Sequence, residues 1–210
     1  MANAITVGRT ILLFIVLWIM YGSNPVVVQW CAPAIAVVVL LDSLDGYVAR
    51  KRHETSQFGA IIDIVGDRIV EVACWIVFAH MGLLPVWIPL LVITRAFLVD
   101  GLRASSYSEG MTAFGEKTMM RSKLTTWLTA SRAMRGTFGG SKVLAFVFLA
   151  VMRAHSLPGG PATLIGQVGD FSWFRICGWI VIWVAVAMTV IRGIPVVVDG
   201  VAYLRAKDAA

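Results

Sequence analysis

Apolar runs long enough to cross a membrane follow one another along the chain, separated by short polar connections. A helix that spans the hydrocarbon core needs about 20 predominantly apolar residues. Runs of this kind lie at approximately 5–21, 26–49, 58–80, 83–102 and 173–198. Glycine and proline in the connections at 22–25 and 82–85 predict tight turns. The pattern therefore predicts a series of transmembrane helices.

The stretch 117–155 is less regular. Residues 143–152 are strongly apolar, but Arg132, Arg135 and Lys142 interrupt the sequence before them. We expect an amphipathic or interfacial start, a break near Gly139-Gly140 and then a short further span. The whole chain is thus predicted to be all-α, a polytopic integral membrane protein of about six transmembrane helices. We expect residues 1–210 to form a single domain.

The composition supports a membrane protein and excludes an ordinary soluble domain. Of the 210 residues, 59% are hydrophobic and 14% are charged. Soluble globular domains are usually about 45–50% apolar and about 25% charged.

The net charge of +6 is unevenly placed, and basic residues follow the second, fourth and last apolar runs. The turns at 22–25 and 80–85 carry neither Lys nor Arg. The positive-inside rule therefore puts both termini and the even-numbered connections in the cytoplasm. No nucleic-acid motif accompanies the charge, so we attribute it to topology and anionic lipid rather than to nucleic acid. We expect a bacterial inner or plasma membrane.

Aspartates gather where the second and third runs meet. Asp42 and Asp45 are three residues apart, and Asp63 and Asp67 are four apart, so each pair shares a helix face. A short turn joins the two runs, and we expect antiparallel neighbouring helices whose carboxylates face each other. An aspartate at a helix centre costs roughly 2.5–3.5 kcal/mol on insertion scales, so a cation must compensate. Carboxylate oxygens suit Mg²⁺ or Mn²⁺, and two ions about 4 Å apart could clamp a phosphoryl displacement.

The full spacing is Asp42-x2-Asp45-Gly46-x2-Ala49-Arg50-x8-Gly59-x3-Asp63-x3-Asp67. It resembles the signature of the CDP-alcohol phosphotransferase family at every fixed position. The resemblance implies a six-helix membrane fold, commonly a homodimer. It also implies transfer of a phosphatidyl or similar group from a CDP-linked donor to an alcohol, with release of CMP.

The same resemblance implies the roles of individual residues. Asp42, Asp45, Asp63 and Asp67 would bind the metal ions, and Asp67 would also be the base that deprotonates the acceptor hydroxyl. The pocket for the CDP-linked donor would be lined by Thr6, Gly46, Ala49, Arg50, Ser56 and Gly59.

Two further stretches resemble the phosphatidylglycerophosphate synthase branch, namely Asn3-Ala4-Ile5-Thr6-Val7-Gly8-Arg9 and Arg95-x5-Gly101-Leu102-Arg103. Arg95 and Arg103 are about two helical turns apart, so one helix could present both. A cationic pocket for a phosphorylated alcohol such as glycerol 3-phosphate would comprise Arg95, Arg103, Lys117, Arg121 and Lys123. The donor would be CDP-diacylglycerol.

The chain departs from that branch at Ala96, where Glu is usual, and at Ile64-Val65-Gly66-Asp67-Arg68, where the usual pattern is P-x-A-D-K. Inositol phosphate, inositol and serine therefore stay open as acceptors. Two other classes of function are an ion-coupled transporter with buried carboxylates and an inactive membrane scaffold. Arg192, near the end of the last run, is interpreted as a boundary residue whose side chain reaches the membrane surface.

Overall fold

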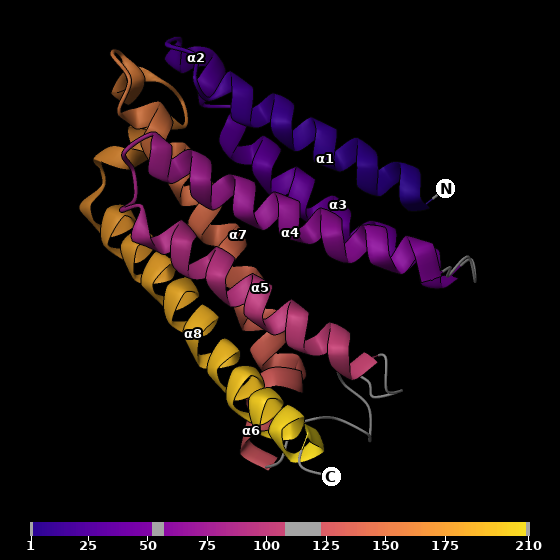
Figure 1. The fold of residues 1–210 in the computed structure, drawn as a ribbon. Coiled ribbons are helices and arrows are strands. Elements are labelled where there is room, and N and C mark those ends of the chain that lie inside the picture. The colour runs from indigo at the N-terminus through magenta and orange to yellow at the C-terminus, as the bar shows by residue number, and fades with distance from the viewer. Residues whose placement is uncertain (1, 52–56, 108–122, 209–210) are drawn as a thin grey trace. The chain divides into compact units, whose positions relative to one another are not determined.

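The computed structural model describes residues 2–51, 57–107 and 123–208, and these residues form helices and connecting turns without a β-strand. The α-helices are α1 (Ala2–Ile19), α2 (Pro25–Val28), α3 (Cys31–Lys51), α4 (Gln57–His80), α5 (Trp87–Tyr107), α6 (Lys123–Ala130), α7 (Arg132–His155) and α8 (Ser172–Asp208). Two short 3-10 helices, Gly160–Ala162 and Gly166–Asp170, lie between α7 and α8. The all-α prediction is confirmed (Figure 1).

The chain divides into two compact units. Unit 1 comprises Met1–Pro89 and Val143–Val181, and unit 2 comprises Leu90–Lys142 and Ile182–Ala210. The predicted metal-binding aspartates belong to unit 1, whereas the predicted acceptor-phosphate residues belong to unit 2.

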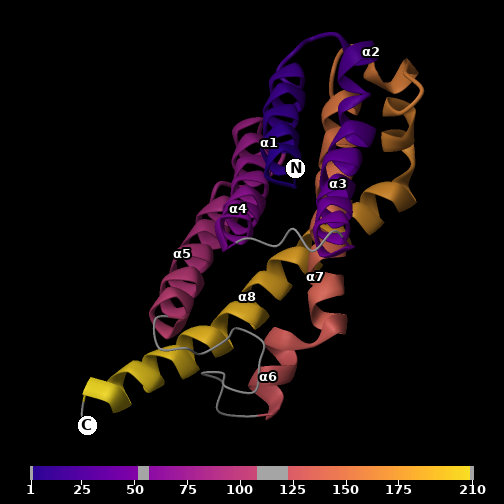
Figure 2. The same ribbon diagram turned by 90° about the vertical axis from the view of Figure 1, so that its right-hand side faces the viewer.

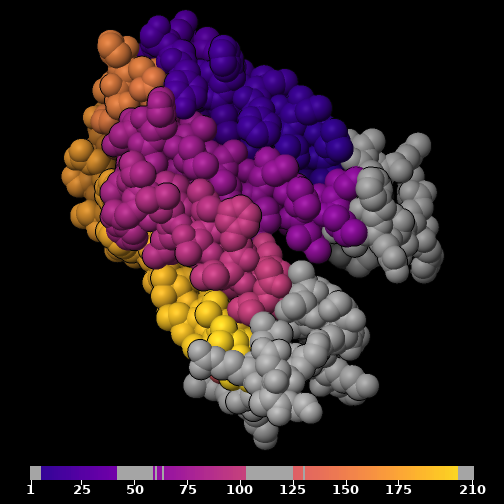
Figure 3. All heavy atoms as spheres, viewed as in Figure 1, coloured from indigo at the N-terminus to yellow at the C-terminus, as the bar shows by residue number. Residues whose placement is uncertain are grey.

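Helix α1 packs against both α3 and α4 in unit 1. Figure 2 shows α1 directly beside α4, and their side chains form one continuous surface in the space-filling view (Figure 3). Leu13, Leu17 and Met20 of α1 are buried. From α4, Trp75 contacts Phe146 of α7 edge-to-face and Phe78 stacks on it, with ring centroids 5.0 and 6.2 Å away. These apolar contacts fix α4 in unit 1.

The turns predicted from glycine and proline are confirmed. The Asn24 side chain caps α2 by accepting a hydrogen bond from the Val26 N–H at 3.0 Å, and Pro25 begins the helix, as favoured at a helix N-terminus. Gly82 has a positive φ of 75°, which glycine adopts without steric cost.

The prediction of a helix break near Gly139-Gly140 is wrong. Helix α7 runs without interruption through both glycines, and the break lies at Ser131, between α6 and α7. The Ser131 hydroxyl accepts a hydrogen bond from the Met134 N–H at 3.2 Å, the usual contact of an N-cap serine. Glycine lowers helix stability by only about 1 kcal/mol relative to alanine, so it does not end a helix by itself.

Exposed apolar surface supports association with a membrane. Within the described residues, 125–155 and 172–202 are long and apolar enough to span a bilayer, and 6–19 and 25–41 form shorter apolar helices. The outer face of α1 presents Ile11, Phe14, Ile15 and Trp18, each more than half exposed. A soluble monomer rarely exposes such a contiguous patch. The number of spans, about six, stays a prediction.

Candidate active site

Helices α3 and α4 carry the predicted donor and metal residues. Asp42, Asp45, Gly46, Ala49 and Arg50 lie in the last turns of α3, before it ends at Lys51. Gly59, Asp63 and Asp67 lie in the first turns of α4. The prediction that both aspartate pairs are helical is confirmed.

Both aspartate-bearing helices pack on α1, and they run in opposite directions (Figure 1). The side chains of Asp42, Asp45 and Asp63 are outside the described part of the structure, and so is Ser56. That the four carboxylates face each other therefore stays a prediction.

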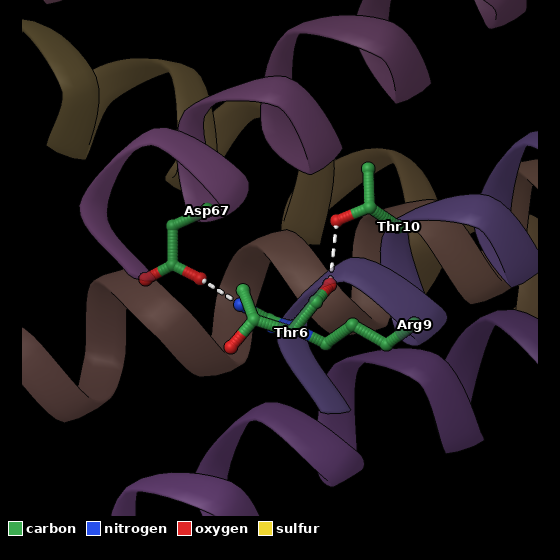
Figure 4. Close-up of polar contacts among 4 residues, drawn as sticks. All are labelled: Thr6, Arg9, Thr10 and Asp67. Atoms are coloured by element: carbon green, nitrogen blue, oxygen red, sulfur yellow. Dashed lines mark hydrogen bonds and ion pairs between the residues drawn. The ribbon is translucent and has the colours of Figure 1, made fainter. Parts of the chain in front are cut away.

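Asp67 is held by a cation from α1. Arg9 Nη2 donates to Asp67 Oδ1 at 2.8 Å (Figure 4). The Arg9 side chain is 2% exposed and that of Asp67 is 51% exposed. A charge-assisted bond of this length is stronger than a neutral one, and it fixes the carboxylate of Asp67 while leaving it accessible. Among the described residues, Asp67 Oδ2 has no hydrogen-bond or ion-pair partner.

Arg9 is a residue of the candidate site that the sequence pattern does not assign. The opening pattern of the chain contains it but predicts no contact for it. Thr6 and Arg9 are three residues apart on α1 and both are buried, so they share one face of the helix. The spacing indicates that Thr6 and Arg9 face a neighbouring helix, but it does not identify the helix that Arg9 contacts.

The close approach of α1 to α4 depends on Gly66. A Cβ at this position would lie 2.9 Å from Thr6 Cγ2 and 3.7 Å from Arg9 Nη2. Thr6 is buried, and its carbonyl accepts a hydrogen bond from the Thr10 hydroxyl at 2.9 Å (Figure 4). The departure from alanine at Gly66 thus has a steric reason in this chain.

Gly66→Ala is expected to lower the thermal stability in detergent and to lower kcat by about 3- to 30-fold. The added methyl group would push against Thr6 and shift Arg9 relative to Asp67. The second substitution Thr6→Ser removes Cγ2 and should restore most of the loss. Gly8→Ala is the control, because a Cβ there meets nothing within 4 Å. Equal activity of the Gly66→Ala and Gly8→Ala variants would contradict the steric account.

The donor chemistry of the site fits a hard cation. Carboxylate oxygens are the ligands that Mg²⁺ and Mn²⁺ prefer, and Asp67 has an accessible carboxylate on α4, the helix that also carries Asp63. No group of three or more acidic, histidine or cysteine side chains gathers within the described residues. Three of the predicted ligands have side chains outside that part of the chain.

The predicted acceptor residues are only partly described. Arg95 and Arg103 both lie on α5, so the prediction that one helix carries them is confirmed. The Arg95 guanidinium carbon lies 5.6 Å from the ring centroid of Phe138. Lys123 is the first residue of α6, and its side chain and that of Arg103 are outside the described part. Lys117 and Arg121 lie outside the described residues altogether.

The interpretation of Arg192 as a residue whose side chain snorkels to the membrane surface is wrong. Arg192 is 7% exposed, and its Nη2 donates to the Thr129 carbonyl at 2.9 Å. A carbonyl at the end of α6 is a favourable partner for a cation, and it draws the side chain into unit 2.

Comparison with known proteins decides the family. Residues 1–191 match the CDP-alcohol phosphatidyltransferase family. The chain belongs to this family. Membership confirms the resemblance carried by the aspartate pattern on α3 and α4. The family transfers phosphatidyl groups from CDP-diacylglycerol to alcohols and generally uses divalent metal ions. Membership and the apolar helices together support a membrane location.

Among similar proteins, one from Bacillus subtilis is named CDP-diacylglycerol–glycerol-3-phosphate 3-phosphatidyltransferase. It is 26% identical over 203 residues, which cover 91% of this chain and 90% of that protein. A Mycobacterium tuberculosis protein provisionally named a cardiolipin synthase is 30% identical over 146 residues, 68% of this chain and 56% of that protein. Another from the same species, provisionally named a phosphatidylglycerophosphate synthase, is 30% identical over 116 residues, 53% of this chain and 54% of that protein.

Proposed function

We propose that this protein transfers the phosphatidyl group of CDP-diacylglycerol to glycerol 3-phosphate, forming phosphatidylglycerophosphate and CMP. The observation that carries the proposal is the similarity to the Bacillus subtilis enzyme of that name over nine-tenths of both chains. That similarity covers 91% of this chain, whereas the two Mycobacterium tuberculosis proteins match 68% and 53% of it. The ion-coupled transporter and the inactive scaffold have no comparable support.

The metal site would comprise Asp42, Asp45, Asp63 and Asp67, holding two Mg²⁺ or Mn²⁺ ions. Bound there, the ions would neutralise the diphosphate of the donor and stabilise the CMP leaving group. The donor pocket would be lined by Thr6, Gly46, Ala49, Arg50, Ser56 and Gly59. Arg50 is suited to the diphosphate, because its fork of N–H donors matches phosphate oxygens.

Asp67 would act as the base. Its carboxylate takes the proton of the acceptor hydroxyl, and the acceptor oxygen then forms a bond to the phosphatidyl phosphorus. The bond from that phosphorus to the oxygen of CMP breaks, and CMP leaves with the electron pair. Arg9 supports this role, because it holds Oδ1 of Asp67 while the carboxylate stays half exposed. A base needs to lie only within hydrogen-bond reach of the proton that it removes.

The acceptor phosphate would be bound by the basic residues of unit 2 and the segment that follows α5, namely Arg95, Arg103, Lys117, Arg121 and Lys123. A phosphate dianion pairs well with several Arg and Lys side chains.

We also propose that the protein is a homodimer in a bacterial inner or plasma membrane, with the active site and both termini in the cytoplasm. The placement of Lys and Arg around the apolar runs supports this orientation.

An acceptor panel tests the proposal. Purified protein in detergent with CDP-diacylglycerol and Mg²⁺ is given glycerol 3-phosphate, inositol phosphate, inositol, serine or phosphatidylglycerol, and CMP release is measured. We expect glycerol 3-phosphate to raise the rate at least about 100-fold over the others, as expected for a site built to bind its phosphate. A preference for phosphatidylglycerol would favour a second function, suggested by the relative provisionally named a cardiolipin synthase. Inert glycerol 3-phosphate with any other active acceptor would overturn the proposal.

A further inference from the structure

Within unit 2, three cationic side chains gather around one buried aromatic ring. Phe138 of α7 is 6% exposed. Its ring centroid lies 5.6 Å from Arg95 Cζ, 5.0 Å from Arg192 Cζ and 4.3 Å from Lys142 Nζ. The cations come from α5, α8 and α7, so the ring lies where three helices of this unit meet.

Arg95 is also constrained along its stem. A Cβ at Gly193 of α8 would lie 2.8 Å from Arg95 Cγ and 3.4 Å from Arg95 Nε. The side chain of Arg95 therefore crosses α8 at a place where only glycine leaves room for it. The aliphatic part of the Arg95 side chain packs against Gly193, and the Arg95 guanidinium lies over the ring of Phe138.

Arg192 closes the same cluster. It donates to the Thr129 carbonyl at 2.9 Å while its guanidinium lies beside the Phe138 ring. Thr129 in turn donates from its hydroxyl to the Thr125 carbonyl at 2.8 Å within α6. The ring is thereby held by a cation that is itself fixed to the end of a helix.

An aromatic ring can position a cation, because the face of the ring attracts the guanidinium electrostatically. The ring offers no acceptor to the in-plane N–H groups of the guanidinium, which are the groups that bind a phosphate.

We propose that Phe138 and Gly193 are positioning residues that hold Arg95 in the orientation that binds the phosphate of the acceptor. The inference rests on the proposed function, in which Arg95 contacts that phosphate. It extends the site to two uncharged residues, neither of which touches substrate.

Steady-state kinetics with varied acceptor tests the inference. Phe138→Leu, which keeps an apolar side chain without a π face, is expected to raise KM for glycerol 3-phosphate about 5- to 30-fold. Gly193→Ala, which pushes on Arg95 Cγ, is expected to do the same. KM for CDP-diacylglycerol should change less than about 2-fold, because uniform loss of acceptor binding leaves donor binding intact. Phe138→Tyr keeps the ring and should restore KM to within about 3-fold of wild type.

Gly140→Ala is the matched control. Gly140 lies on α7 like Phe138, and a Cβ there would meet nothing within 4 Å. Unchanged acceptor KM in both Phe138→Leu and Gly193→Ala, in variants that elute and melt like wild type, would overturn the inference. So would equal shifts in Phe138→Leu and Phe138→Tyr, which would mean that shape rather than the π face matters. If one variant does not fold, the other still decides.

The acceptor used by the wild-type protein separates this inference from the proposed function. If the wild type uses inositol phosphate in place of glycerol 3-phosphate, the proposed function fails, and the same shift of KM is expected for inositol phosphate. If the wild type uses only acceptors without a phosphate, both fail.

Discussion

Asp67→Asn is expected to lower kcat by about 10²- to 10⁴-fold, the usual contribution of a general base. Asparagine has the shape of aspartate, and its carbonyl oxygen can still accept the bond from Arg9 Nη2 that Asp67 Oδ1 accepts at 2.8 Å. The variant therefore keeps the contact between α1 and α4 but loses the group that takes the proton. The measurement is CMP release under saturating substrates.

Because Asp67 is proposed both as base and as metal ligand, a Mg²⁺ titration of the Asp67→Asn variant distinguishes the two roles. A lost ligand shifts the half-saturating Mg²⁺ concentration, and excess metal then restores the rate. A lost base is not restored by metal. Activity of Asp67→Asn near that of wild type, or its full recovery at high Mg²⁺, would contradict the assignment of Asp67 as base.

Arg9→Met is expected to lower kcat by about 10- to 100-fold, the cost of a misplaced catalytic group. Methionine fills much of the buried volume of the arginine stem but leaves Asp67 Oδ1 without its bond from Arg9. Arg9→Lys keeps the positive charge and should recover part of the loss, but not all, because lysine lacks the rigid fork of a guanidinium. KM for both substrates should change little, because Arg9 acts through Asp67.

The double variant Arg9→Met with Asp67→Asn provides the control. If Arg9 acts through Asp67, the double variant should be no slower than Asp67→Asn alone, because residues that share one interaction are not additive. Fully additive losses would show that Arg9 acts independently of Asp67 and would contradict its positioning role.

The sequence predicted the helices and their order because their signals are local. Helical spacing put Asp42 and Asp45 at the end of α3 and Asp63 and Asp67 at the start of α4. The turn at 22–25 was predicted for the same reason, since Asn24 and Pro25 act on their immediate neighbours.

The contacts of Arg9 and Arg192 could not be predicted, because their partners are distant in the chain. Asp67 is 58 residues from Arg9, and Thr129 is 63 residues from Arg192. The periodicity of apolar residues identifies the buried face of a helix, but not the face of the other helix against which it packs. The break at Ser131 differs from the prediction because a serine N-cap begins the helix there, whereas a pair of glycines lowers helix stability without ending the helix.

The identity of the lipid product tests the central claim most directly. Wild-type protein is incubated with CDP-diacylglycerol, isotope-labelled glycerol 3-phosphate and Mg²⁺, with a chelated sample in parallel, and the lipids are analysed by mass spectrometry alongside CMP. The account predicts labelled phosphatidylglycerophosphate and CMP in equal amounts, both absent when the metal is removed. CMP release without any lipid that carries the label, or equal product with and without the metal, would contradict it.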